Sequence, residues 1–128
     1  MSLAIETAGL EPENIDLVFA DAFGDSEWDA IEARAIKHVF GDRRVPVTAP
    51  KTMVGRLYAG GAALDVAAAL LAIRDSVIPP AINIDDPAPD CDLDLVIGQA
   101  REAELRNVLV SARGFGGFNG ALVLRAAD

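Results

Sequence analysis

The sequence contains one cysteine and one histidine among 128 residues. A single cysteine, Cys91, excludes an internal disulfide and any metal site built from several cysteines. It lies among carboxylates, which raise a thiol pKa and disfavour nucleophilic chemistry. His38 is expected on the surface near the end of a helix, where the helix dipole favours positive charge. No Ser-His-Asp set, Cys-His pair or histidine-based metal site can be assembled, so we expect neither a metal nor another cofactor.

Positive charge is also scarce, with 11 Lys and Arg against 20 Asp and Glu and a formal net charge of −9. This balance argues against nucleic acid and anionic membranes as partners. The longest apolar run, residues 57–73, approaches membrane length but is rich in Ala and Gly and is therefore only weakly hydrophobic. The first residues have neither a basic nor an apolar signal region, which predicts a cytosolic protein.

A hydrophobic content of 52% and a charged content of 24% are typical of a globular protein, and the length suits one domain over residues 1–128. Residues 4–8 read as the end of a helix that Gly9 stops. We therefore expect a segment of a longer chain, in which residues 1–3 are not native sequence.

The pattern of apolar residues predicts an α/β domain with helices packed on a mixed sheet, whose last two strands form an antiparallel pair. Ser26 and Asp29 form a capping-box pattern that starts one helix. Its expected apolar stripe consists of Trp28, Ile31, Ala35 and Val39, widened by Ile36 and Phe40. The glycine-rich segment 114–117 lies between two strands, so a tight turn is favoured over a phosphate loop. The expected strands are 15–20, 44–48, 93–97, 108–112 and 121–124, and the long helices are 26–40 and 60–75.

Helix 60–75 is apolar on every side, which predicts a central helix that is buried all round. Asp65 is the only charge within it, and a buried carboxylate has to be paired. Lys51 is the natural partner. More broadly, charged residues gather at predicted loop and helix ends, and either a structural ion-pair network or a proton-transfer site fits their types. These residues are Asp21, Asp29, Glu32, Lys51, Arg56 and Asp65.

Four stretches of the sequence resemble the C-terminal half of a β-ketoacyl synthase. Residues 51–66, K-T-M-V-G-R-L-Y-A-G-G-A-A-L-D-V, resemble the family motif T-K-S-x-x-G-H-x-x-G-A-A-G-A-x-E. Residues 114–119, G-F-G-G-F-N, resemble its closing G-F-G-G-H-N. Residues 15–32 occupy the place of V-N-A-H-G-T-S-T-P-x-x-D-x-x-E, and residues 74–94 are also close to the family. The resemblance implies the C-terminal half of a thiolase-like fold.

The resemblance places the family's two catalytic histidines on Asp21 and Arg56. It keeps the family lysine as Lys51, and it implies that Glu32 and Asp65 keep acidic positions that pair with this lysine. Phe115 keeps the aromatic residue of the closing turn, where Phe118 replaces a histidine or threonine. The family's nucleophilic cysteine belongs to the N-terminal half and is not in this chain.

The replacement of both histidines is typical of a protein that has the family's fold but does not catalyse the condensation reaction. A carboxylate at position 21 would repel the oxyanion that decarboxylation of a malonyl thioester develops, and a guanidinium at position 56 cannot act as a base. The sequence is similar to the chain-length factor, the ketosynthase-β subunit of type II aromatic polyketide synthases.

This resemblance implies no catalytic residues of its own, heterodimer formation with a catalytic ketosynthase, indirect contact with an acyl carrier protein, and a role in shaping the polyketide chamber. Two alternatives stay open. One is a true condensing or acyl-transferring enzyme in which Asp21 and Lys51 carry protons, and the other is a stand-alone interaction domain. For the segment by itself we expect a homo-oligomer through helix 60–75, with Ala63, Ala67 or Leu71 at the contact.

Overall fold

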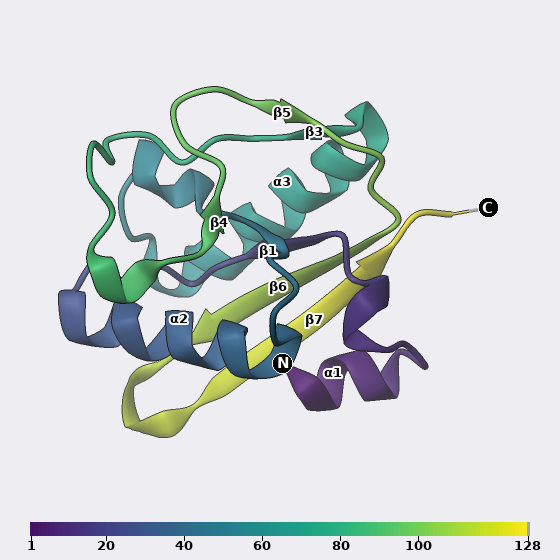
Figure 1. The fold of residues 1–128 in the computed structure, drawn as a ribbon, viewed down its shortest axis with the longest axis horizontal. Coiled ribbons are helices and arrows are strands. Elements are labelled where there is room, and N and C mark those ends of the chain that lie inside the picture. The colour runs from purple at the N-terminus through teal and green to yellow at the C-terminus, as the bar shows by residue number, and fades with distance from the viewer. Residues whose placement is uncertain (128) are drawn as a thin grey trace.

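The computed structural model describes residues 1–127 and contains a five-stranded sheet in the order β4-β2-β1-β6-β7 (Figure 1). Four strands run parallel, and the last one is antiparallel to β6. The mixed sheet and its C-terminal antiparallel pair are therefore as predicted. The strands are β1 (Leu17–Phe19), β2 (Pro46–Thr48), β4 (Asp94–Leu95), β6 (Asn107–Arg113) and β7 (Asn119–Arg125).

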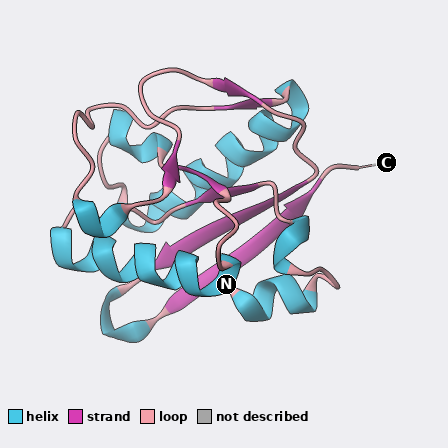
Figure 2. Cartoon of the chain, viewed as in Figure 1, coloured by secondary structure: helices cyan, strands magenta, loops and turns pink. Residues whose placement is uncertain are grey.

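A second, two-stranded sheet lies outside this prediction. It pairs β3 (Val77–Ile78) with β5 (Arg101–Glu102) in antiparallel fashion. The Pro79-Pro80 pair lies directly after β3 and allows no helix there, so the chain runs on as the long loops seen in Figure 2.

Helices cover both faces of the large sheet. Helices α1 (Ser2–Thr7) and α2 (Ser26–Phe40) pack on one face, and α3 (Gly61–Asp75) packs on the other. Successive side chains of a strand point to opposite faces of the sheet, so each strand contributes to a hydrophobic core on either face. Within β1, Val18 packs toward α1 and α2, whereas Leu17 and Phe19 pack toward α3.

Helix α2 spans the predicted residues but has a different cap and a partly different buried face. Asp25, not Ser26, is the capping residue, because its carboxylate accepts hydrogen bonds from the backbone N–H groups of residues 27 and 28. The predicted stripe was partly right, since Ile36 and Phe40 are buried, whereas Trp28 and Ile31 are 51% and 37% exposed. Besides Ile36 and Phe40, the buried face carries Ala30, Glu32 and Ala33. Ile36 and Phe40 pack on this side against the core that includes Val47, and Glu32 has its buried partners there.

Helix α3 starts and ends close to the prediction, but it is not buried on every side. Its sheet-facing side carries Gly61, Asp65, Ala69 and Ala72, which are buried. The opposite side is open, and Leu70 and Leu71 are 50% and 49% exposed. The side of an apolar helix is buried only where another element packs against it. Within the described residues the large sheet packs along one side of α3, and the opposite side stays exposed.

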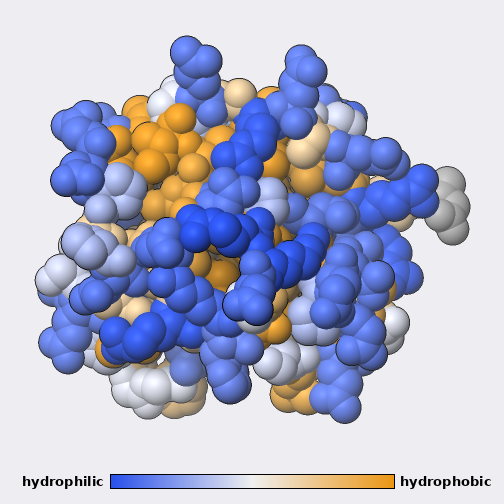
Figure 3. All heavy atoms as spheres, viewed as in Figure 1, coloured by the Kyte–Doolittle hydropathy of each residue, from blue (hydrophilic) through white to orange (hydrophobic). Residues whose placement is uncertain are grey.

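The outer surface is mostly hydrophilic in the view of Figure 3, in keeping with the acidic composition. Apolar surface gathers at the upper left, over the segment that follows β2, where Met53 and Val54 are about half exposed. None of the helices within residues 1–127 has the length and apolar character that crossing a membrane requires.

Candidate functional site

The predicted pairing of Lys51 with Asp65 is present. Lys51 lies in the 3₁₀ turn after β2, and its Nζ is 2.7 Å from Oδ2 of Asp65 on α3. Both groups are buried, with Lys51 6% exposed and Asp65 fully covered. Burial raises the pKa of Asp65, and the hydrogen bond and charge of Lys51 oppose that rise. The ion pair thus makes a charge tolerable on the apolar side of α3.

Asp21 lies just beyond the carboxyl end of β1 and meets three cations. Its Oδ1 is 3.8 Å from Lys51 Nζ, and its Oδ2 is 3.3 Å from Arg56 Nη1 and 3.7 Å from Arg113 Nε. Parallel neighbours β1 and β2 bring residues 21 and 51 to the same edge of the sheet. The negative charge of the Asp21 carboxylate is therefore balanced by these three cations.

Arg113, the last residue of β6, was not among the predicted site residues. Its Nη1 donates to the carbonyl oxygen of Trp28 at 2.8 Å, and its own carbonyl accepts from Arg56 Nη2 at 3.2 Å. The available sequence signal was its position directly before the glycine-rich turn 114–117. Only the pairing of β6 with β1 shows that this arginine reaches the cluster.

Glu32 holds the loop that follows β1. Its carboxylate accepts the backbone N–H groups of Asp21 and Ala22, each at 2.9 Å, and pairs with Arg113 Nη2 at 3.3 Å. The expected pairing with Lys51 is wrong, because Glu32 approaches the loop from α2 and finds Arg113 there. Ala22 has a φ of 43°, in the left-handed region that alanine disfavours. Burial raises the pKa of Glu32, against the lowering effect of these hydrogen bonds and of Arg113.

Aromatic side chains border the charges on their exposed side. Phe115, at the tip of the β6–β7 hairpin, meets Phe23 edge to face at 5.7 Å between ring centroids. The guanidinium of Arg56 lies 4.0 Å above the Phe23 ring. The tip is the tight turn that was predicted, with positive φ at Gly116 and Gly117. Phe115 is 75% exposed, so the turn presents this ring outward.

Cys91 lies apart from this arrangement in a 3₁₀ turn that packs near α2. Burial raises its thiol pKa, and the carboxylates of Asp29 and Asp90 raise it further. The thiol is therefore a poor nucleophile. Among residues 1–127, no group of three or more His, Cys, Asp and Glu side chains could hold a metal ion.

The class of protein follows from this fold and from the comparisons. The sequence model of the β-ketoacyl synthase C-terminal domain matches residues 1–85, and the chain belongs to that family. It is 58% identical over 123 residues to the tetracenomycin polyketide synthase ketoacyl synthase beta subunit of Streptomyces glaucescens. The aligned residues make up 96% of this chain and 30% of that relative.

Two solved structures extend the likeness to the whole described fold. The ishigamide ketosynthase/chain length factor superposes with a TM-score of 0.96 at 38% identity, over 99% of this chain and 32% of that one. A type II polyketide synthase acyl-carrier protein in complex with its ketosynthase bound to the hexaketide gives a TM-score of 0.95 at 30% identity, over 99% and 32%. The thiolase-like fold is thereby confirmed. The chain spans about a third of the length of these relatives.

Proposed function

We propose that this chain is part of a chain-length-factor subunit, the non-catalytic ketosynthase-β partner in aromatic polyketide biosynthesis. The observation that carries the proposal is the contact between Asp21 and Arg56, 3.3 Å apart at the two positions that resemble the family's histidines. The similarity to a polyketide ketoacyl synthase beta subunit supports it independently.

The geometry argues against condensation chemistry at these positions. A malonyl decarboxylation site has to present hydrogen-bond donors to a developing oxyanion. Here Asp21 presents a carboxylate, and Arg56 is held by Asp21, by the Arg113 carbonyl and by the Phe23 ring. Lys51 is engaged with Asp65 and is 6% exposed, so it is poorly placed to exchange protons with a substrate.

The proposed partner of the whole protein is a catalytic ketosynthase, with which it would form a heterodimer that shapes the chamber for the growing chain. The support is the name of one structural neighbour, a ketosynthase/chain length factor. A second neighbour is described with an acyl-carrier protein, which supports indirect contact of the heterodimer with that carrier.

We expect the chain, alone or with acyl carrier protein, to release no carbon dioxide from a malonyl-carrier above the buffer blank. The reason is the replacement of both histidine positions by the ion pair of Asp21 and Arg56. Radiolabelled carbon dioxide release measures this directly. Release that Lys51→Ala abolishes, and that Asp21→Asn also lowers, would establish the alternative of an atypical active synthase.

The segment alone is expected to self-associate through the open side of α3. Ala63 and Ala67 are exposed there, and Leu71 is 49% exposed. Burying such a surface gains about 25 cal/mol per Å². Sedimentation at high protein concentration should show a dimer or larger species that Ala67→Glu disperses. A monomer at that concentration, or a dimer that Ala67→Glu leaves intact, would rule out this face.

A further inference from the structure

The two edges of the large sheet differ in how they are protected. Edge strand β4 has two residues, and Asp94 within it pairs with Arg101 Nη1 at 2.7 Å. Edge strand β7 has seven residues, with no proline, no acidic side chain and a charge only at its last residue, Arg125. Long, regular edge strands are templates for pairing, and proteins usually shorten, charge or cover them. Among residues 1–127 no strand pairs with the outer side of β7, so a further strand can add there.

The hydrogen bonds at both ends of the β6–β7 ladder show which backbone groups of β7 face outward. The Gly114 N–H donates to the Phe118 carbonyl at 2.6 Å, and the Ala126 N–H donates to the Arg106 carbonyl at 2.8 Å. Both pairs belong to one register, in which residues of β7 alternate between bonding to β6 and facing away from it. The outward-facing residues have no backbone hydrogen bond within the described chain, and they are Asn119, Ala121, Val123 and Arg125.

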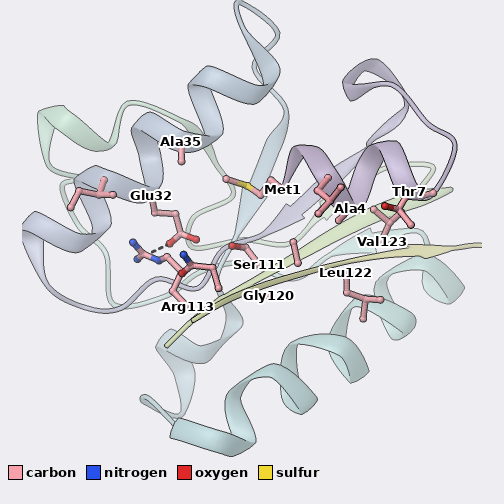
Figure 4. A pocket seen from close by; sticks show the side chains of 15 residues that line it. Met1, Ala4, Thr7, Glu32, Ala35, Ser111, Arg113, Gly120, Leu122 and Val123 are labelled. Atoms are coloured by element: carbon pink, nitrogen blue, oxygen red, sulfur yellow. Dashed lines mark hydrogen bonds and ion pairs between the residues drawn. The ribbon is translucent and has the colours of Figure 1, made fainter. Parts of the chain in front are cut away.

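Apolar side chains of β7 lie on both faces of the sheet. In the view of Figure 4, the side chains of Leu122 and Val123 point to opposite sides of the strand (Figure 4). Val123 packs toward the core that α1 and α2 cover, and Leu124 packs toward the core beneath α3. Leu122, in the middle of the strand, is 45% exposed. The edge therefore offers apolar contacts in addition to unpaired backbone groups.

A second copy of β7 fits this edge in one antiparallel register. When the two strands pair about Leu122, every outward-facing residue meets an outward-facing residue, so each such pair can exchange two hydrogen bonds. Leu122 then faces Leu122 of the second copy, and each remaining pair sets a large side chain against a small one or a charge against a neutral group. These pairs are Asn119 with Arg125, Gly120 with Leu124, and Ala121 with Val123. A strand that complements itself in this way forms a two-fold symmetric contact.

Charge also favours a second copy at this edge. The chain carries a formal net charge of −9, so two copies repel each other over most of their surfaces. Residues 105–127, which include β6, the turn and β7, contain three arginines and no aspartate or glutamate. The β7 edge is therefore a place where two acidic chains can pair without a carboxylate side chain in either strand.

We propose that β7 pairs reversibly with β7 of a second copy, antiparallel and centred on Leu122, so that the two five-stranded sheets become continuous. The two Leu122 Cα atoms then lie about 4.5 Å apart, as in a non-hydrogen-bonded antiparallel pair. A single strand pair is a weak contact by itself, so covalent trapping detects it better than sedimentation. The contact lies at the sheet edge and not on the open side of α3, and it does not depend on the proposed function.

An engineered disulfide tests this register. In a Cys91→Ser background, Leu122→Cys should form an intermolecular disulfide under mild oxidation, because Cα atoms about 4.5 Å apart lie within disulfide range. Gly120→Cys is the matched control, since Gly120 is exposed on the same face of β7. The two copies of position 120 lie four residues apart in the register, roughly 13 Å, which is too far. Non-reducing electrophoresis should show a covalent dimer for Leu122→Cys and almost none for Gly120→Cys.

Adding Ala67→Glu to the Leu122→Cys protein separates this contact from self-association through α3. The yield of covalent dimer should stay the same, because α3 takes no part in the pairing of β7. A yield that Ala67→Glu abolishes would overturn the proposal. Equal yields from Leu122→Cys and Gly120→Cys, or no covalent dimer from Leu122→Cys, would also overturn it.

The pair of Asn119 with Arg125 provides a second test, in which the register and the net charge predict opposite results. Both residues are exposed. In the Leu122→Cys protein, Asn119→Asp should speed disulfide formation about two- to threefold by facing Arg125 of the second copy, and Asn119→Lys should slow it similarly. General repulsion between acidic chains predicts the reverse, because Asn119→Asp makes the net charge more negative. The reverse order of rates would overturn the proposed register.

Discussion

Lys51→Met is expected to lower the thermal unfolding midpoint by more than about 10 °C. The substitution leaves the fully buried Asp65 carboxylate without its cation, and removing one partner of a buried ion pair costs about 3–5 kcal/mol. For a domain of this size each kcal/mol shifts the midpoint by about 3–5 °C. Differential scanning calorimetry of the two proteins measures the change.

Two further variants distinguish the buried pair from a general effect of losing a lysine. The double variant Lys51→Met with Asp65→Leu should recover much of the lost stability, since it removes both charges together. Arg74→Met breaks the pair of Arg74 with Asp75 at the exposed end of α3 and should change the midpoint by less than about 2 °C. If Lys51→Met leaves the midpoint within error, the ion pair of Lys51 with Asp65 contributes nothing measurable to stability.

Glu32→Ala is expected to destabilise the protein by a similar amount and to loosen the loop after β1. The carboxylate is the acceptor for two backbone N–H groups and the ion partner of Arg113, all in a largely buried setting. Unsatisfied buried donors cost about 1–3 kcal/mol each. Hydrogen exchange should become faster at the amides of Asp21 and Ala22, together with a lower unfolding midpoint.

Glu27→Ala is the matched control, because Glu27 is exposed on the same helix and its side chain has no hydrogen bond within the described residues. It should alter stability by only the small contribution of an acidic residue in the first turn, about 0.5 kcal/mol. Glu32→Gln should fall between the two, since its amide oxygen can still accept one N–H group. Unchanged exchange at residues 21 and 22 in Glu32→Ala would show that the loop holds its own conformation.

Features that depend on local pattern or on a few apolar residues were predictable from the sequence. Short apolar runs bounded by turn residues located the strands of the large sheet and the β6–β7 hairpin, helical spacing located α2, and a long all-apolar run located α3. The single carboxylate in an apolar helix identified the pair of Asp65 with Lys51, because a buried charge requires a partner and few cations lay near. The motifs around residues 51–66 and 114–119 identified the family.

Features that depend on which distant elements meet were decided only by the tertiary structure. Arg113 enters the charge cluster because β6 lies beside β1, a neighbour relation that no local pattern encodes. Glu32 pairs with Arg113 and not with Lys51 because α2 approaches the loop after β1 from the side of β6 and β7. Ile36 and Phe40 of the predicted stripe pack in the core, whereas Trp28 and Ile31 lie where no element covers them fully. Helix α3 is half open because a helix becomes buried only where the fold supplies a second layer.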